Sequence, residues 1–238
     1  MVRRLPNVAA LAIACAGTAA VAAPVVIWPV DPIIPADSQA SALWIENKGD
    51  APITMQVRAL GWQQAGGADD YPRQSDVAIS PPMAVVQPGQ RQLVRIIRRT
   101  RAAAPESSYR LLIDELPPPG EDGERGGTSA QVAIQMRYSI PLFAYSTPRE
   151  NAVPQLSSRV ELADGRRYLV VSNSGNGHAR LVNLRARAGT GQIPLIAGLV
   201  GYVLPGASMR WPLPAEAPVS ATFIVNVNGK DLSLAASA

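Results

Sequence analysis

The residue types that support enzymatic chemistry are scarce in this sequence. The chain has one histidine, His178, directly after a glycine-rich turn, and one cysteine, Cys15. A single histidine and a single cysteine exclude the usual zinc sites, which need several such ligands. No G-x-S-x-G nucleophile motif accompanies His178, so a Ser-His-Asp triad has no support. We interpret His178 as a surface or turn residue and predict neither a metal site nor a cofactor.

Paired carboxylates and phosphate-binding loops give no better catalytic site. Asp114 and Glu115 are adjacent at the end of a predicted strand, and adjacent strand residues point to opposite faces. Gly126-Gly127 is not followed by the Lys-Ser or Lys-Thr of a phosphate-binding loop. The sequence therefore predicts a binding protein, not an enzyme, without a small-molecule substrate.

Charge and aromatic content argue against nucleic acid as a partner. The chain has 22 basic and 18 acidic residues, and only 5% of its residues are aromatic. This charge is too small for strong attraction to an anionic polymer, and the aromatic residues are not interleaved with basic ones. One basic cluster lies near a predicted strand end, where we interpret it as a solvated rim: Arg91, Arg98, Arg99 and Arg101.

The N-terminus has the three parts of a secretory signal. Arg3-Arg4 precedes an apolar run over residues 8–22, and the run ends in the small-residue sequence AVAA. We predict that residues 1–23 are a cleaved signal peptide. Cys15 lies within them, so the mature chain is cysteine-free and relies on a hydrophobic core. Lipid attachment at Cys15 is the alternative, although the residues before it match such a site poorly.

Short alternating segments predict an all-β protein without long helices. The clearest example places Ile53, Met55 and Val57 on one face of a strand. The clearest predicted strands are 41–45, 53–59, 77–79, 90–97, 109–116, 130–140, 159–162, 168–171, 181–186, 209–213 and 222–227, and a further element ends at Tyr202–Gly206. About seven strands per half, spaced by turns, are typical of immunoglobulin-like β-sandwiches.

Turn residues divide the chain and set the predicted domain limits. Residues 63–73 are largely polar and contain Gly66-Gly67, which predicts a loop. The pattern of strands stops at Ser146–Asn151, which we interpret as an inter-domain link. The predicted domains therefore span residues 24–147 and 148–238.

The segment 130–140 has one face that is apolar nearly from end to end. The side chains of this face belong to Ala130, Val132, Ile134, Met136, Tyr138 and Ile140. One interpretation is a core strand of the first sandwich. The other is an exposed apolar edge, which proteins normally avoid unless a partner strand covers it. Such an edge also favours self-association of the free protein.

Several collinear segments resemble one known family. They are Glu106 to Pro118 (ESSYRLLIDELPP), Arg137 to Phe143 (RYSIPLF), Pro81-Pro82, Gln87 to Ile96 (QPGQRQLVRI), Asn173 to Ala179 (NSGNGHA) and Gly201 to Gly206 (GYVLPG). Together they are similar to the periplasmic pilus-assembly chaperones, the PapD-like family. The resemblance extends from about Val25 to Leu232, which is nearly the whole predicted mature chain.

The resemblance implies a fold, a location and a mechanism. Two immunoglobulin-like sandwiches would form an L in the periplasm, with a pilus or fimbrial subunit held in the cleft for delivery to an outer-membrane usher. The last strand of the first domain would complete the subunit's own sandwich. By position the donor side chains are Val132, Ile134 and Met136, with Ala130 as a marginal fourth. Each buried aliphatic side chain contributes about 1.5–3 kcal/mol.

The sequence departs from the family at the anchor for the subunit's carboxyl terminus. Familiar members use an arginine and a lysine, but the corresponding positions here fall near Asp31 and Pro141. This departure resembles the archaic branch, which builds different pili or spore-coat-like polymers. Arg137 and Arg95 are candidate replacements because a guanidinium can grip a carboxylate bidentately. A local ion pair is the alternative interpretation for both.

Other function classes have weaker support. A secreted structural subunit or surface adhesion module would normally be one incomplete domain with an N-terminal donor extension, whereas this chain has two predicted domains and an internal donor segment. A hydrolase would depend on His178 alone. A carbohydrate-binding sandwich would need clustered exposed aromatic residues.

Overall fold

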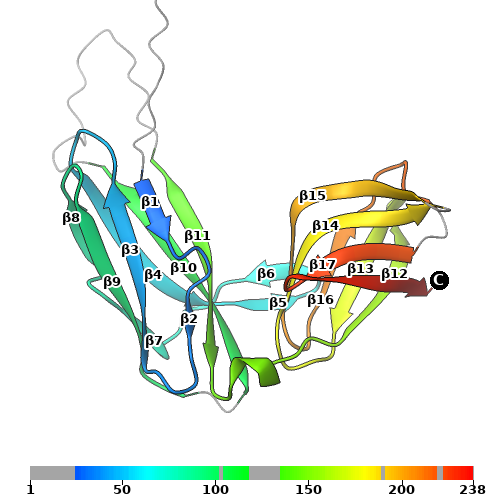
Figure 1. Ribbon diagram of the computed structural model, residues 1–238, viewed down its shortest axis with the longest axis horizontal. Helices are drawn as coiled ribbons and strands as arrows, with labels where there is room; N and C mark the ends of the chain where they lie inside the picture. Colours follow the sequence, from blue (N-terminus) through cyan, green and yellow to red (C-terminus); the bar gives the residue numbers. More distant parts are fainter. Residues whose placement is uncertain (1–24, 102–103, 118–134, 189–190, 219–221, 238) are drawn as a thin grey trace, which may run out of the picture.

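Two β-sandwich domains meet at an angle and give the molecule the shape of an L (Figure 1). The computed structural model describes residues 25–101, 104–117, 135–188, 191–218 and 222–237. The link between the domains contains one turn of 3-10 helix, η1 (Arg149–Asn151). The predicted all-β, two-domain fold is confirmed. Across the described ranges, no helix has the length and apolar character needed to cross a membrane.

The first domain packs two layers around one core. One layer has the order β1-β3-β9-β7 and contains β1 (Val25–Trp28), β3 (Ala40–Asn47), β9 (Arg91–Arg98) and β7 (Val77–Ser80). The other has the order β2-β11-β10-β4-β8 and contains β2 (Ile33–Ile34), β11 (Arg137–Tyr145), β10 (Glu106–Leu116), β4 (Ile53–Gly61) and β8 (Met83–Val86). Among the described residues, every strand pairing in these layers is antiparallel except the short parallel one between β2 and β11. Ile53, Met55 and Val57 are buried between the layers, which confirms the alternation predicted for β4.

The second domain is a seven-stranded sheet that curls into a sandwich. Its order is β15-β14-β17-β18-β12-β13-β16. The strands are β12 (Leu156–Ala163), β13 (Arg166–Asn173), β14 (Ala179–Ala188), β15 (Gly191–Val203), β16 (Ser208–Pro212), β17 (Thr222–Val227) and β18 (Lys230–Ser237). A short parallel pairing of β12 with β18 joins the two halves of the sheet. The edge strands β15 and β16 also contact each other.

In each domain, a buried asparagine at the end of a strand forms hydrogen bonds near a Pro-Gly turn. The Asn47 amide nitrogen donates to the carbonyls of Ala51 (2.7 Å) and Val86 (2.9 Å). The Asn173 amide nitrogen donates to those of Gly177 (2.8 Å) and Val203 (3.1 Å). Both asparagines are almost fully buried. Each asparagine therefore provides a donor to a buried backbone carbonyl, that of Val86 or that of Val203.

A short hairpin leaves the first domain and contacts the second, where the sequence predicted a loop. It consists of β5 (Gln63–Ala65) and β6 (Ala68–Asp70), and Figure 1 shows it bridging the angle of the L. The Gln64 side chain donates to the Tyr202 carbonyl (3.0 Å) and accepts from the Leu204 amide (2.8 Å). The loop prediction is wrong because these polar side chains pair with the backbone of a distant domain.

One member of the basic cluster is buried, so the prediction of a solvated rim is wrong for it. Arg98 is only 9% exposed and donates to the carbonyl oxygens of Tyr145, Pro35, Ala36 and Ser38. Burial lowers the pKa of this guanidinium. Arg98 therefore fastens the turn before β3 to the end of β11. Arg91, Arg99 and Arg101 are exposed, as predicted.

Candidate functional site

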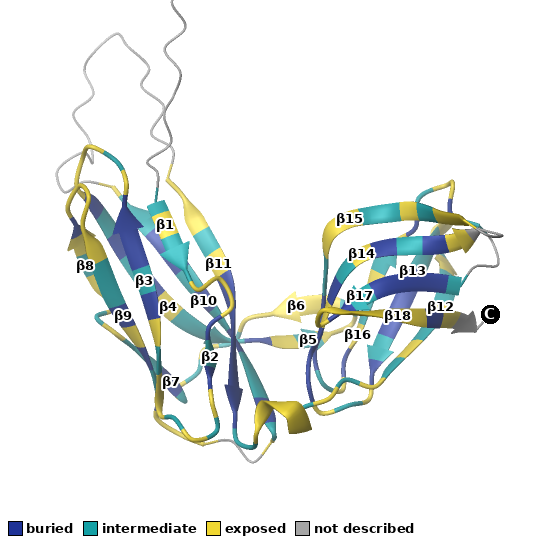
Figure 2. Ribbon diagram, viewed as in Figure 1, coloured by how far each residue is buried: buried dark blue, intermediate teal, exposed yellow. Residues whose placement is uncertain are grey.

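The candidate site is the cleft between the two domains. A cavity of about 920 Å³ opens there, with walls from β1, β10 and β11 on one side and from β14, β15 and β16 on the other. Figure 2 shows many exposed or half-buried residues on the strands that face each other across this angle. The two domains thus present one continuous surface on the inside of the L.

The strand β11 leaves an open edge in this cleft. The strand β10 pairs with it from Glu106↔Tyr145 to Asp114↔Arg137. On the other side, β2 pairs only with Phe143 and Ala144. In the described part of the chain, the edge of β11 from Arg137 to Leu142 therefore has no strand partner on this side. An edge strand of this kind is a template for pairing with another chain.

The predicted donor residues lie at and before the start of β11. Ala130, Val132 and Ile134 lie outside the described residues. Met136 is described and is 36% exposed, and its carbonyl accepts from the Glu115 amide (3.0 Å). The predicted strand over 130–140 begins, as described, at Arg137 and continues to Tyr145. Its core-facing residues Ile140 and Leu142 are buried in the first domain.

The two arginines proposed as carboxylate anchors do not lie together. Arg137 lines the cavity, but it is hydrogen-bonded to Asp114, which also accepts from Arg58 (2.6 Å). Burial would raise the pKa of Asp114, but the hydrogen bonds from Arg137 and Arg58 hold it below its usual value. Arg95 is exposed on β9, in the other layer, and does not line the cavity.

A third arginine, Arg110, lies on the floor of the cleft. Its guanidinium carbon lies 3.7 Å from the ring centre of Trp62 and 5.6 Å from that of Tyr202. It pairs in register with Pro141, and both line the cavity. Its Nε is buried and has no hydrogen-bond partner among the described residues. Stacking on the two rings therefore holds the Arg110 guanidinium on the cavity floor. Its Nε has no strong hydrogen-bond acceptor there.

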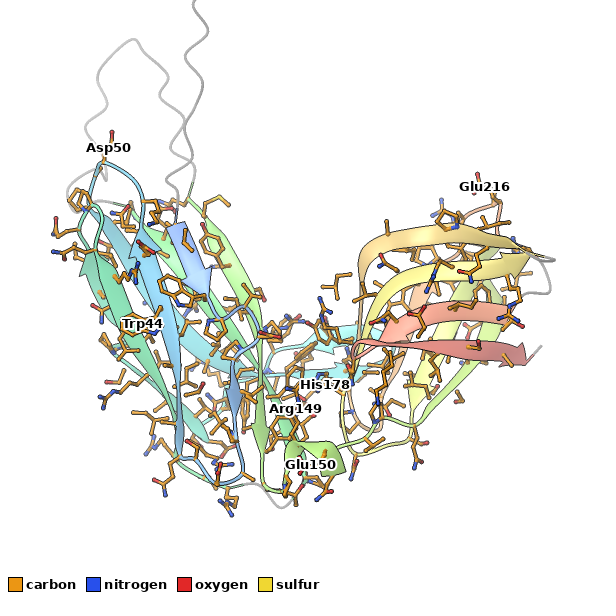
Figure 3. The ribbon with its side chains drawn as sticks, in the orientation of Figure 1. Trp44, Asp50, Arg149, Glu150, His178 and Glu216 are labelled. Atoms are coloured by element: carbon orange, nitrogen blue, oxygen red, sulfur yellow. The ribbon has the colours of Figure 1, made fainter. Side chains whose placement is uncertain are left out.

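The hinge behind this floor contains a buried contact between the domains. Glu106 accepts from the His178 backbone amide (2.9 Å) and contacts His178 Nδ1 (2.9 Å). The Phe143 ring stacks on His178 with a centroid distance of 3.5 Å. Figure 3 shows His178 at the hinge, near Arg149. His178 directly follows the turn, as predicted, but it is only 8% exposed, so the prediction of a surface position is wrong. Glu106 and Phe143 both belong to the first domain, so this contact crosses between the domains.

The link between the domains packs tightly on the turn that carries His178. A Cβ atom at Gly177 would lie 2.2 Å from the Ala152 carbonyl oxygen. Burial raises the pKa of Tyr145 near the hinge, and the Glu106 carboxylate raises it further. A side chain at position 177 would push the link away, so this glycine is a steric requirement of the hinge.

Comparison with known protein families identifies the first domain. Residues 25–147 match the model of the pili and flagellar-assembly chaperones, PapD N-terminal domain. The chain belongs to this family. Comparison with curated protein sequences gives no significant match.

Solved structures agree with this assignment. The chaperone is 28% identical to a chain in the CsuC–CsuE chaperone–tip adhesion subunit pre-assembly complex from the archaic Csu pili of Acinetobacter baumannii, with a TM-score of 0.73 and coverage of 91% of this chain and 100% of that one. It also matches the complex of the SafA pilin with the SafB chaperone of Salmonella enterica (18% identity, TM-score 0.64, coverage 91% and 98%). The Pseudomonas aeruginosa CupB2 chaperone matches at 16% identity (TM-score 0.60, coverage 89% and 100%). The last two show the fold alone.

The family assigns a chaperone role and points away from enzymatic chemistry. Within the described residues, no group of three or more His, Cys, Asp or Glu side chains could hold a metal ion. The histidine that a hydrolase would need is held by Glu106 and Phe143 in the hinge. The charged residues that line the cleft are three arginines and two aspartates: Arg110, Arg137, Arg180, Asp31 and Asp69.

Sequence reasoning missed two residues at the base of the cleft, Arg110 and Trp62. Arg110 alternates with buried residues of β10, which marks it only as facing away from the core. Trp62 stands between an apolar strand and a polar segment, and it is 3% exposed. A large apolar side chain beside the polar segment 63–73 was the signal available in the sequence for a contact beyond the first domain. His178 stood out as the single histidine, but nothing near it in the sequence indicated its contact with Glu106.

Proposed function

We propose that this protein is a periplasmic chaperone that binds pilus or spore-coat-like subunits by donor-strand complementation and delivers them to an outer-membrane usher. The resemblance to chaperones in complex with pilus subunits supports the class of partner. The similarity to the archaic Csu complex supports placing it in the archaic branch. No enzymatic step is part of this function.

The observation that carries the proposal is the open edge of β11 in the cleft. Residues 137–142 pair with β10 on one side, and β2 begins its pairing only at Phe143. A subunit strand placed along this edge would form main-chain hydrogen bonds with β11. Alternate side chains of the chaperone's donor segment would then enter pockets in the subunit. The cavity beside the edge provides space for the incoming chain.

The donor side chains are Val132, Ile134 and Met136, with Ala130 at the end of the series. They share the parity of Tyr138 and Ile140, which face the core of the first domain. The same face therefore serves the chaperone core at its C-terminal end and the subunit at its N-terminal end. Burial of three aliphatic side chains would contribute about 5–9 kcal/mol before the cost of ordering the segment.

The subunit's carboxyl terminus binds at Arg110 in this proposal. Arg137 is already paired with Asp114, and Arg95 lies outside the cavity. Arg110 lies beside Pro141, the position where the family resemblance expects a cation, and stacking on Trp62 holds it in place. A guanidinium can form a charge-assisted pair with a carboxylate at this point.

The proposed processing and domain limits follow the sequence interpretation. Residues 1–23 would be removed on export, and residues 24–147 and 148–238 would form the two domains. Signal cleavage is checked by N-terminal sequencing of the protein recovered from the periplasm.

Co-expression with candidate subunits tests the function. The tagged chaperone is produced in a bacterial periplasm with each small exported protein encoded near it, and the complexes are isolated by pull-down. Wild type is compared with a variant carrying Val132→Asp, Ile134→Asp and Met136→Asp. We expect a one-to-one complex with a small β-sandwich protein and its loss in the variant.

A matched control has three exposed apolar residues of the second domain changed to Asp: Val153, Leu162 and Leu232. This control should keep the subunit, because it adds the same charge away from the cleft. If the donor variant binds as well as the control, the donor-strand proposal fails and a surface-module function takes its place.

A further inference from the structure

The second domain presents an apolar shelf to the cleft where the two edges of its sheet meet. The shelf consists of Leu199 and Val200 on β15 with Met209 and Trp211 on β16. Figure 1 shows β15 on the side of the second domain that faces the first. The strands β15 and β16 are the opposite edges of one curled sheet, so Trp211 covers the seam between them.

Gly201 allows the tryptophan to lie against the strand. A Cβ atom at this position would be 2.9 Å from Trp211 Cζ2 and 3.1 Å from its Nε1. The φ angle of Gly201 is 154°, which side-chain-bearing residues rarely adopt. The absence of a side chain thus lets the indole pack against the backbone of β15.

The shelf is only partly packed against the core of the second domain, and part of its apolar surface is exposed. Leu199 is 54% exposed, although Val200, Met209 and Trp211 are half-buried against the core. Exposed apolar groups that gather in a concave site usually mark a binding surface. Arg110 and the open edge of β11 line the same cavity as the shelf.

We infer that the Leu199–Trp211 shelf is a second contact surface for the pilus subunit and receives an apolar side chain of the subunit beside its carboxyl terminus. This inference rests on the proposed function. The shared cavity supports the subunit as the occupant, because a chain anchored at Arg110 and paired with β11 must pass between the two walls. The second domain then takes part in selecting the subunit.

A substitution at the most exposed shelf residue tests this role. Leu199→Asp places a charge on the shelf, and Leu162→Asp is the matched control because Leu162 is 72% exposed on β12, outside the cavity. We expect Leu199→Asp to weaken retention of the co-expressed subunit about tenfold, as the loss of a buried interface contact does. Leu162→Asp should retain the subunit like the wild type. Equal retention by both variants would overturn the inference.

Thiol labelling measures the contact directly and separates the two proposals. Cys15 is the only cysteine of the chain, so in a Cys15→Ser background Leu199→Cys and Leu162→Cys each provide one thiol. Labelling by a maleimide is compared in the free chaperone and in its purified complex with the small exported protein that co-purifies. We expect the thiol at position 199 to react at least about tenfold more slowly in the complex, and that at 162 to react at an unchanged rate.

The outcomes distinguish the two failures. If the complex forms and position 199 labels equally fast in both states, the shelf is not a contact surface, and strand donation stands. If the wild type retains no subunit from any candidate, the proposed function fails and the inference fails with it. A folded Leu199→Asp variant, checked by circular dichroism, excludes simple unfolding as the cause of lost binding.

Discussion

The carboxylate of Glu106 holds His178 across the hinge by its backbone amide and its ring, each at 2.9 Å. The two residues come from different domains, and both are more than nine-tenths buried. Phe143 stacks on the imidazole, and the β5–β6 hairpin adds a second set of bonds through Gln64. Specific contacts across the hinge, some of them buried, therefore support the angle of the L.

The hinge pair should contribute strongly to stability. Glu106→Ala leaves a buried amide and a buried imidazole without their acceptor, so we expect it to lower the free energy of unfolding by about 3 kcal/mol. Glu106→Gln should cost less, because its amide oxygen still accepts from the His178 backbone. The measurement is urea unfolding of the purified chaperone.

The control for the hinge pair is Glu161→Ala, which removes an exposed ion pair with Arg159 (3.1 Å). Its expected cost is below about 1 kcal/mol. Similar losses for Glu106→Ala and Glu161→Ala would contradict a buried hinge contact.

Acid should remove the stabilisation that Asp114 provides. The folded-state pKa of Asp114 is lowered, since the hydrogen bonds from Arg137 and Arg58 outweigh the effect of burial. A lowered pKa stabilises the folded protein above the ordinary carboxyl value, and this gain is lost as pH falls through the folded pKa. We expect Asp114→Asn to cost about 2 kcal/mol at pH 7 and progressively less below about pH 4.

Unfolding by urea at a series of pH values measures this difference. Asp50→Asn, in an exposed turn, is the control and should show little difference from the wild type throughout the series. A cost of Asp114→Asn that stays constant from pH 7 to pH 2 would show that the carboxylate charge makes no contribution.

The repeated asparagines should be similarly costly to remove. Asn47→Ala and Asn173→Ala each remove two hydrogen bonds from a buried amide to backbone carbonyls, and we expect a loss of about 2–3 kcal/mol for each. Thermal unfolding followed by circular dichroism provides the comparison, with the exposed Asn151→Ala as control. A melting temperature for either variant equal to that of the control would refute the shared role.

Comparison of three arginine substitutions identifies the anchor for the subunit carboxylate. Methionine keeps most of the apolar stem of arginine and removes the charge. We expect Arg110→Met to weaken subunit retention about tenfold or more, since it removes one charge-assisted contact. Arg95→Met and Arg137→Met should each retain the subunit within about threefold of the wild type. If Arg95→Met or Arg137→Met caused the largest loss of subunit retention, that arginine would be the anchor and Arg110 would not. Pull-down of the co-expressed subunit measures all three.

The local pattern of the sequence was sufficient for the strands but not for the contacts between domains. The alternation of Ile53, Met55 and Val57 reports which face of β4 is buried, because a strand reverses its side chains at every residue. The roles of Arg98 and His178 depend on hydrogen-bond partners far away in the sequence: Tyr145 is 47 residues from Arg98, and Glu106 is 72 residues from His178. Neither residue has neighbours in the sequence that indicate these partners.

The candidate site was predicted in part, for a comparable reason. The apolar stripe ending at Tyr138 and Ile140 could be predicted because the alternation of its side chains arises within a single strand. These two residues do pack on the core. The cleft floor combines Arg110, Trp62 and Tyr202 from three separate segments. Only the folded arrangement brings them together. The donor residues Ala130, Val132 and Ile134 remain a prediction from the sequence.

Hydrogen–deuterium exchange of residues 128–136 tests strand donation most directly. Exchange is measured by mass spectrometry in the free chaperone and in its purified complex with the co-expressed subunit. Strand donation predicts that these backbone amides exchange about 100-fold or more slowly in the complex, because each alternate amide enters a ladder with the subunit. The buried strand β10 should exchange slowly in both states. Equally fast exchange of residues 128–136 in both states, in a complex that is otherwise intact, would contradict the account.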